Sequence, residues 1–240
     1  MQPYGPSDDL DEIAARNNAD WCAAVWRSHG LPVEAGSGLV FCPARTPRYY
    51  PNVVTVERCA DPAGQVSAIA ALSAAHPDIP LAVKDSFARL DLAPLGFEEL
   101  FEARWIHRRA TSDPAAPGPV QWRKIDAEAD LAAWEAAWNT AGDPARVFVP
   151  ALLGDPSVAL LAGFDADGAV RAGGVASLGG GVLGLSNLFG SRRGVLQTAA
   201  ALWPDLDMVG YESGNDLKTM EYYGFSALGP LRVWTSEALA

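Results

Sequence analysis

The hydrophobic pattern of the second half of the chain predicts an antiparallel meander followed by alternating helices and strands. The three strands of the meander come first, at 158–164, 170–177 and 182–189. They are joined by Asp165–Gly168 and Leu178–Gly181, two segments with the composition of hairpin turns. The rest alternates helix and strand, over 191–202, 208–212, 216–223 and 226–235. This order predicts an α/β (α+β) fold with a mixed, mostly antiparallel sheet flanked by helices.

The first half of the chain carries weaker versions of the same signals. Its helical patterns cover Asp8–Ser28, where Ser7 or Asp8 is a candidate cap, and 65–75. Its strand patterns lie at 39–42, 53–56, 81–84 and 97–107. The sequence Gly96-Phe97-x-x-Leu100 matches Gly224-Phe225-x-x-Leu228, and in both cases an apolar strand and a short helix precede it. The match predicts a duplicated fold whose N-terminal copy is reduced.

A segment rich in small residues and proline separates the two copies. Three of the ten residues in 110–119 are prolines, which is typical of a linker. We therefore predict a reduced N-terminal domain over 1–109, a linker over 110–119 and a second domain over 120–240. Within the second domain, we expect a strand over 121–125 and a helix over 127–139 capped by Asp126.

Composition narrows the classes of partner. The net charge is −11 and the pI is near 4.6, so we expect no nucleic-acid partner. No stretch approaches the roughly 20 apolar residues that span a bilayer, and the acidic N-terminus does not resemble a signal peptide, so we expect a cytoplasmic protein without membrane contact. The three cysteines lack metal-ligand spacing and the histidines are scattered, so we expect no metal. The oligomeric state does not follow from the sequence.

Taken together, the meander, the loop and helix after it, and the Gly224-Phe225 motif resemble the GNAT acetyltransferase superfamily. The resemblance implies a site where the fourth and fifth strands, 182–189 and 208–212, splay apart. It implies acetyl-CoA or another acyl-CoA as co-substrate, with its pyrophosphate on the N–H groups that begin the next helix. The residues that it implies as the acyl-CoA site are Leu188, Phe189, Gly190, Ser191, Arg192, Arg193, Gly194 and Val195, with Asn215 on the following helix.

The chain departs from the family pattern at two positions. The pyrophosphate loop of the family has the form Q/R-x-x-G-x-G/A, and aligning its first glycine with Gly194 places Leu196 at the last small residue. A leucine there would crowd backbone that a phosphate must approach. The tyrosine that family members use to protonate the leaving thiolate aligns with Met220, and Tyr222 is the nearby candidate for that role.

Two carboxylates are candidates for the general base that takes a proton from an attacking amine. Glu212 ends the fifth predicted strand and is the first candidate, and Asp216 is the second. The alternatives are a salt bridge of Glu212 with Arg232 and a helix-capping role for Asp216.

The sequence thus favours an acyl-CoA-dependent N-acyltransferase that acts on a small-molecule amine by direct attack. One alternative is a repurposed protein of the same fold that has lost acyl-CoA binding and instead binds a ligand or a partner. A second alternative is an aminoacyl-tRNA-dependent transferase, against which the acidity weighs.

Overall fold

One mixed sheet of eleven strands runs through the described part of the chain, in a computed structural model that describes residues 10–111, 120–140, 142 and 146–237. The strand order is β1-β2-β3-β4-β11-β5-β10-β9-β8-β7-β6. Most neighbours are antiparallel, and the pairs β3–β4 and β9–β10 are parallel. The predicted mixed, mostly antiparallel sheet with flanking helices is confirmed.

The first half of the molecule, residues 10–111, contributes five strands and two α-helices. Its helices are α1 (Leu10–Ser28) and α2 (Pro62–Ala75), and a short 3-10 helix, η2, covers Ala93–Leu95. Its strands are β1 (Glu34–Gly36), β2 (Leu39–Phe41), β3 (Val53–Thr55), β4 (Ala82–Asp85) and β5 (Glu98–Arg108).

The second half, from residue 120 onward, contributes six strands and three α-helices within its described residues. The helices are α3 (Glu128–Trp138), α4 (Arg192–Leu202) and α5 (Gly214–Tyr222), and a 3-10 helix, η3, covers Pro150–Gly154. The strands are β6 (Gln121–Lys124), β7 (Val158–Phe164), β8 (Val170–Gly179), β9 (Val182–Phe189), β10 (Met208–Glu212) and β11 (Ser226–Thr235).

The last strand of each half pairs with strands of the other half. Strand β11 pairs with β4, strand β5 pairs with β10, and β5 and β11 pair antiparallel with each other. The turns before them are alike: Gly96 and Gly224 have φ values of 81° and 85°. After each glycine, the phenylalanine N–H donates to the carbonyl five residues back. Two copies with exchanged terminal strands would produce this topology, and the duplication itself stays a prediction.

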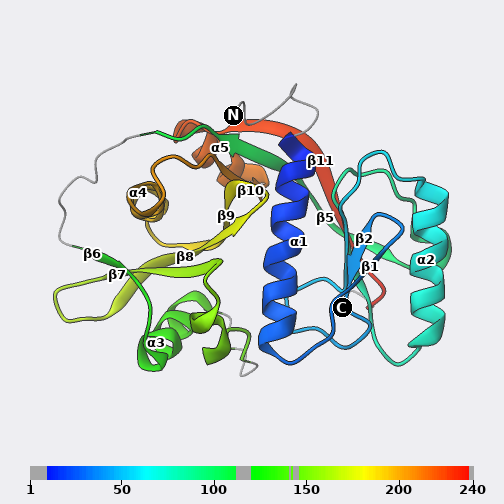
Figure 1. Cartoon of the computed structure of the whole chain (residues 1–240), viewed down its shortest axis with the longest axis horizontal. Coiled ribbons are helices and arrows are strands. Elements are labelled where there is room, and N and C mark those ends of the chain that lie inside the picture. Colours follow the sequence, from blue (N-terminus) through cyan, green and yellow to red (C-terminus); the bar gives the residue numbers. More distant parts are fainter. Residues whose placement is uncertain (1–9, 112–119, 141, 143–145, 238–240) are drawn as a thin grey trace.

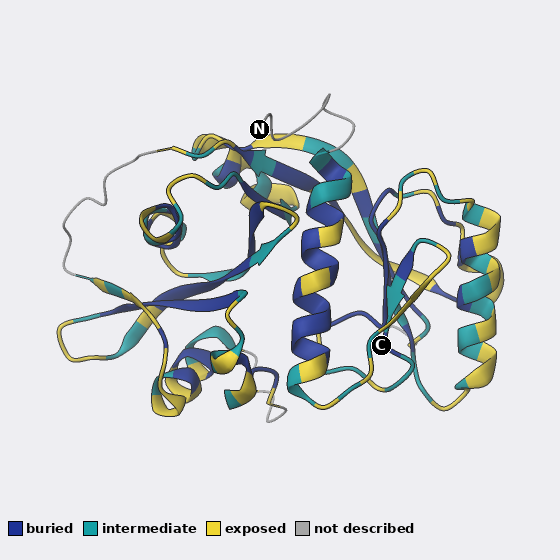
Figure 2. Ribbon diagram, in the orientation of Figure 1, coloured by how far each residue is buried: buried dark blue, intermediate teal, exposed yellow. Residues whose placement is uncertain are grey.

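Helix α1 lies in the hollow of the bent sheet, with β6–β9 on one side and β1–β4 on the other (Figure 1). It is buried along most of its length (Figure 2), which its small residues permit because alanines let the helix approach the sheet closely. The side chain of Asn17 donates hydrogen bonds to the carbonyls of Ser177 and Gly179, at the β8–β9 hairpin. This helix thereby fixes the position of β9 relative to the first half.

Apolar clusters cover both faces of the sheet. On the face of α1 and α3, Trp21, Trp134 and Phe148 are buried in an aromatic cluster with Trp138 and Phe189. On the opposite face, α4 and α5 pack over β7–β10 through Leu196, Met220 and Phe225, among others. Among the described residues, no helix is both long and apolar enough to cross a membrane.

The element boundaries differ from the predicted ones mainly at helix starts. Helix α2 begins at Pro62, three residues early, because the Asp61 side chain accepts hydrogen bonds from the N–H groups of Ala63 and Gly64. The predicted cap of α3 at Asp126 is wrong: the N-cap residue is Ala127, which makes no side-chain capping bond. Ser7, Asp8 and most of the predicted linker lie outside the described residues.

Candidate functional site

The two parallel strands β9 and β10 separate shortly after they begin to pair. Met208 pairs with Leu183 and Val209 with Gly184, and the pairing ends there. From that point β10 stays paired with β5 as far as Glu212, while β9 stays paired with β8. The two strands therefore open toward their carboxyl ends, as the GNAT resemblance predicts for the fourth and fifth strands.

A bulge in β9 bends the strand at the opening. The pairing with β8 shifts between Ser186 and Phe189, so β9 carries one more residue than β8 there. Asn187 occupies the left-handed region with φ 54°, which asparagine tolerates better than most residues. Its Oδ1 accepts a hydrogen bond of 3.1 Å from the Tyr50 hydroxyl, so a loop of the first half holds the bulge.

A cavity of about 220 Å³ lies at this opening and is formed by both halves of the molecule. From the second half it is lined by Leu185, Ser186, Asn187, Leu188, Arg192, Tyr211, Glu212 and Asp216. From the first half it is lined by Asn18, Trp21, Cys22, Tyr49, Tyr50, Pro51 and Lys84. Within the described ranges, no group of three or more His, Cys, Asp or Glu side chains could hold a metal ion.

Glu212 ends β10 at the rim of the opening. Burial raises its pKa to about 7, and the Asp216 charge adds to this, while the Arg192 guanidinium lowers the pKa. The predicted alternative, a salt bridge of Glu212 with Arg232, is wrong, because Arg232 pairs with Glu99 and Glu102 instead. A carboxyl group with this pKa is close to half ionised at neutral pH, which suits proton transfer.

Arg192 and Asp216 form an ion pair of 2.8 Å between the N-termini of α4 and α5. The Arg192 Nε atom is buried and has no hydrogen-bond partner among the described residues. Asp216 lies in the first turn of α5 but is not its cap, since Ser213 is the N-cap residue. The structure thus brings Glu212 and Asp216 together at one cavity and adds Arg192 beside them.

The start of α4 presents backbone N–H groups next to the cavity. The Ser191 hydroxyl caps the helix and accepts a hydrogen bond from the Gly194 N–H, at 3.3 Å. A Cβ on Gly194 would lie 2.1 Å from the Trp122 ring, so this glycine is required by packing. Leu196 is buried in the core beneath α4 and does not line the cavity, so it does not block the opening.

The other predicted site residues lie at the edge of the site or outside it. Gly190 makes the turn into α4 with φ 64°, where a Cβ would meet the Arg171 carbonyl. The side chains of Phe189 and Val195 pack in the core, and those of Arg193 and Asn215 are exposed. Tyr222 is 84% exposed at the far end of α5 and does not line the cavity.

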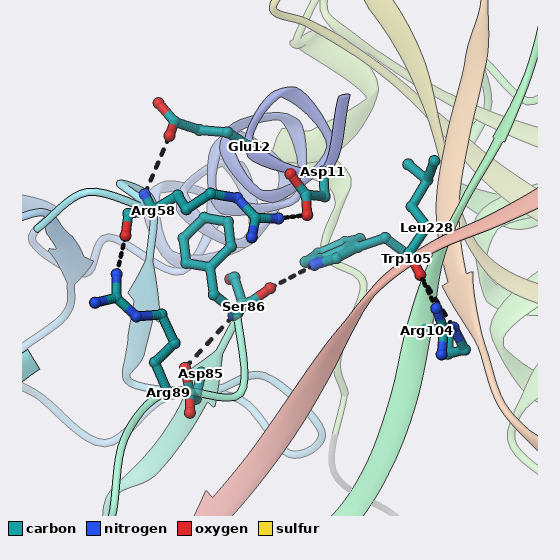
Figure 3. A network of polar contacts seen from close by, with 10 residues as sticks. Asp11, Glu12, Arg58, Asp85, Ser86, Arg89, Arg104, Trp105 and Leu228 are labelled. Carbon is teal, nitrogen blue, oxygen red and sulfur yellow. Dashed lines mark hydrogen bonds and ion pairs between the residues drawn. The ribbon is translucent and has the colours of Figure 1, made fainter. Parts of the chain in front are cut away.

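The first half closes the corresponding position between β3 and β4. There the Ser86 N–H donates to Thr55 Oγ1, and the Asp85 carboxylate accepts hydrogen bonds from the N–H groups of Phe87 and Leu90. Trp105 Nε1 donates to the Ser86 carbonyl at 2.7 Å (Figure 3). Asp85 ends β4 as Glu212 ends β10, and both Asp85 and Ser86 are buried, so these two residues stabilise the fold.

Three residues that line the cavity, Asn18, Tyr50 and Lys84, are not predicted as site residues from the sequence. They come from a strand, a helix and a loop that only the tertiary structure brings together. One sign was present at Lys84, since a lysine ended an otherwise apolar strand pattern.

No model of a known protein family matches the sequence, and a search among curated proteins finds no match either. Solved structures do match. A GCN5-related N-acetyltransferase from Kribbella flavida has a TM-score of 0.57 at 13% identity, covering 92% of this chain and 96% of its own. Another from Sphaerobacter thermophilus has a TM-score of 0.54 at 12% identity, covering 96% of this chain and 93% of its own. The chain therefore has the fold of the GNAT acetyltransferases.

Proposed function

We propose that this protein is an N-acyltransferase that moves an acyl group from acyl-CoA, acetyl-CoA in the first place, to a small-molecule amine. The observation that carries the proposal is the position of Glu212, whose pKa is near neutrality, at the opening between two parallel strands. The GNAT fold adds support, since acyltransferases of that fold bind acyl-CoA.

The residues around the opening fit an acyl-CoA molecule. Beyond Leu185, the edge of β9 that faces β10 is free of β10 and could pair with the amides of a pantetheine arm. The first N–H groups of α4 and the Arg192 guanidinium, with its unpartnered Nε, would face the pyrophosphate. Leu196 leaves this approach clear because its side chain is in the core.

In the proposed reaction the amine nitrogen bonds to the thioester carbonyl carbon while the bond from that carbon to sulfur breaks. Glu212, in its ionised form, takes the proton that the amine loses, and the CoA sulfur leaves as a thiolate. A backbone N–H of the β9 bulge would donate to the carbonyl oxygen, where negative charge develops. No covalent enzyme intermediate is required, because alignment of the two reactants supplies much of the rate.

The Arg192–Asp216 ion pair favours one alternative. It joins the starts of α4 and α5 on the side from which a pyrophosphate would enter. If Arg192 stays paired with Asp216 and does not bind a pyrophosphate, the protein is a repurposed member of the fold that binds a ligand or a partner without catalysis. In the transferase, the pyrophosphate would compete with Asp216 for the Arg192 guanidinium.

The test is to incubate the protein with acetyl-, propionyl- or malonyl-CoA and a panel of small amines, and to measure free thiol and acylated amine. We expect turnover with at least one pair and its loss in Glu212→Gln, which keeps the size of the side chain. Glu221→Gln, an exposed change on α5, is the matched control and should leave turnover intact. The absence of turnover with every pair would favour the repurposed protein that has lost acyl-CoA binding, and full activity of Glu212→Gln would remove Glu212 as the base.

A further inference from the structure

The cavity contains a buried cation that the proposed proton transfer does not use. Lys84 is 4% exposed, yet it lines the cavity together with Glu212. It comes from β4 of the first half, whereas Glu212 comes from β10 of the second half.

The ammonium group of Lys84 has few partners. Its Nζ donates a hydrogen bond of 2.7 Å to Asn18 Oδ1 on α1 and lies 4.2 Å from the centre of the Tyr211 ring. Among the described residues, no carboxylate forms an ion pair with it. An ammonium has three N–H donors, so the single conventional hydrogen bond leaves two for another group.

A buried charge without a counter-ion is costly, and such charges are normally paired. The acidic side chains of the cavity do not fill this need. Asp216 is paired with Arg192, and the charges that act on the Glu212 carboxyl group are those of Arg192 and Asp216. An anionic ligand that enters the cavity could therefore act as the counter-ion of Lys84.

The two ends of the cavity differ in chemistry. The Lys84 ammonium lies over the ring of Tyr211, which directly precedes Glu212. Neighbouring residues of a strand point to opposite faces of the sheet. A cation therefore lies on the α1 face, and the proposed base lies beside the opening. The Tyr50 hydroxyl and the Asn18 amide add hydrogen-bonding groups at the Lys84 end.

We propose that Lys84 binds a carboxylate of the acceptor, so that the substrate is a small amino acid whose amine lies at Glu212. A carboxylate carries one negative charge and so matches the single ammonium, whereas a phosphate monoester carries about −1.5 to −2 at pH 7. This inference rests on the proposed transferase function and names the class of its acceptor.

The experiment compares the wild type with Lys84→Met, which keeps a similar chain length and removes the charge. Lys124→Met, the same change at an exposed position of β6, is the control. Acceptors are offered in pairs that share the amine and the spacer, such as β-alanine with β-alaninamide and 4-aminobutyrate with its amide. The readouts are kcat/KM at saturating acetyl-CoA and, separately, calorimetric binding of each acceptor without the CoA ester.

We expect the wild type to prefer the acid of a pair by at least about tenfold, as a charge-assisted contact supplies. Lys84→Met should lose that preference, with kcat/KM falling about tenfold or more for acids and little for amides. Equal use of acids and amides by the wild type, or an unchanged preference in Lys84→Met, would overturn the inference. If no amine is turned over, the calorimetric binding decides. Acids that bind more tightly than amides, and lose this advantage in Lys84→Met, would support the anion site and contradict only the transferase function. Acids that bind no better than amides would contradict the anion site.

Discussion

The raised pKa of Glu212 results from its position at the end of β10. It is the last residue of β10, and the strand opening leaves it partly covered by the starts of α4 and α5. Burial favours its neutral form, and the nearby Asp216 charge does the same, so both raise its pKa. The Arg192 charge lowers the pKa but does not cancel the larger effect of burial.

The first prediction concerns the pH dependence of acyl transfer. Glu212 acts as a base only when ionised, so kcat/KM should rise with pH and level off above an apparent pKa of about 7. Glu212→Gln should be slower by about 10²-fold or more and should lose this step in the profile. The measurement is a pH–rate series from pH 5 to 9 at constant ionic strength. A wild-type profile that is flat across neutrality would contradict the assignment.

The second prediction concerns stability. The native state binds the Glu212 proton more tightly than the unfolded chain, so between pH 4.5 and about 7 the unfolding free energy falls as the pH rises. The loss reaches at most about 3.5 kcal/mol, since the pKa rises from 4.5 to about 7 and one pKa unit is worth about 1.4 kcal/mol. Denaturant unfolding should show that Glu212→Gln gains stability relative to the wild type as the pH rises from 5 to 8. A pH-independent difference would argue against a raised pKa.

At the scale of elements, the start of α4 and the bulge of β9 define the opening. Ser191 caps the helix, and Gly194 lets the Trp122 ring pack against the first turn. The bulge at Asn187 bends β9, and Tyr50 of the first half holds it through a hydrogen bond. Arg192 at this helix start and Asn187 in this bulge both line the cavity.

The third prediction tests the packing below α4. Gly194→Ala places a methyl group where the Trp122 ring lies, so we expect a loss of about 1–3 kcal/mol from overpacking. Gly36→Ala in β1 is the control, because a Cβ there would meet no atom within 4 Å. Thermal or denaturant unfolding of both variants measures the difference. Equal stability of the two variants would show that Trp122 does not pack as described.

Many of the strands could be predicted from the sequence. The strands 158–164, 182–189, 208–212 and 226–235 were predicted with the observed bounds, because apolar runs between glycine-containing turns mark them clearly. Strand β1 was missed, since three exposed residues carry no apolar pattern. The strand opening and Glu212 came from the GNAT resemblance. The contributions of Lys84 and Tyr50 could not be predicted, because they depend on how the two halves pack.

At the scale of the whole molecule, the two halves share one sheet and one cavity. Strands β5 and β11 each pair with strands of the other half, and α1 packs against strands of both halves. A site built in this way depends on the first half, although the corresponding position between β3 and β4 is closed by Asp85 and its partners.

The fourth prediction follows from the exchanged strands. Residues 1–109 and 120–240, produced separately, each lack a strand that the other half supplies, so we expect neither to fold alone. The full chain should unfold in one cooperative transition by calorimetry and circular dichroism. Two separate transitions, or a folded isolated half with dispersed NMR signals, would show instead that the halves are independent domains.

The most direct test of the whole account is a calorimetric titration of acetyl-CoA into the full chain, the Arg192→Ala variant and the Arg171→Ala control. The Arg171 side chain is exposed on β8, pairs with Asp165 and does not line the cavity. We expect saturable binding of one molecule per chain, weakened about tenfold or more in Arg192→Ala and unchanged in Arg171→Ala. An absence of binding to the full chain, also with propionyl- and malonyl-CoA, or full affinity in Arg192→Ala, would contradict it.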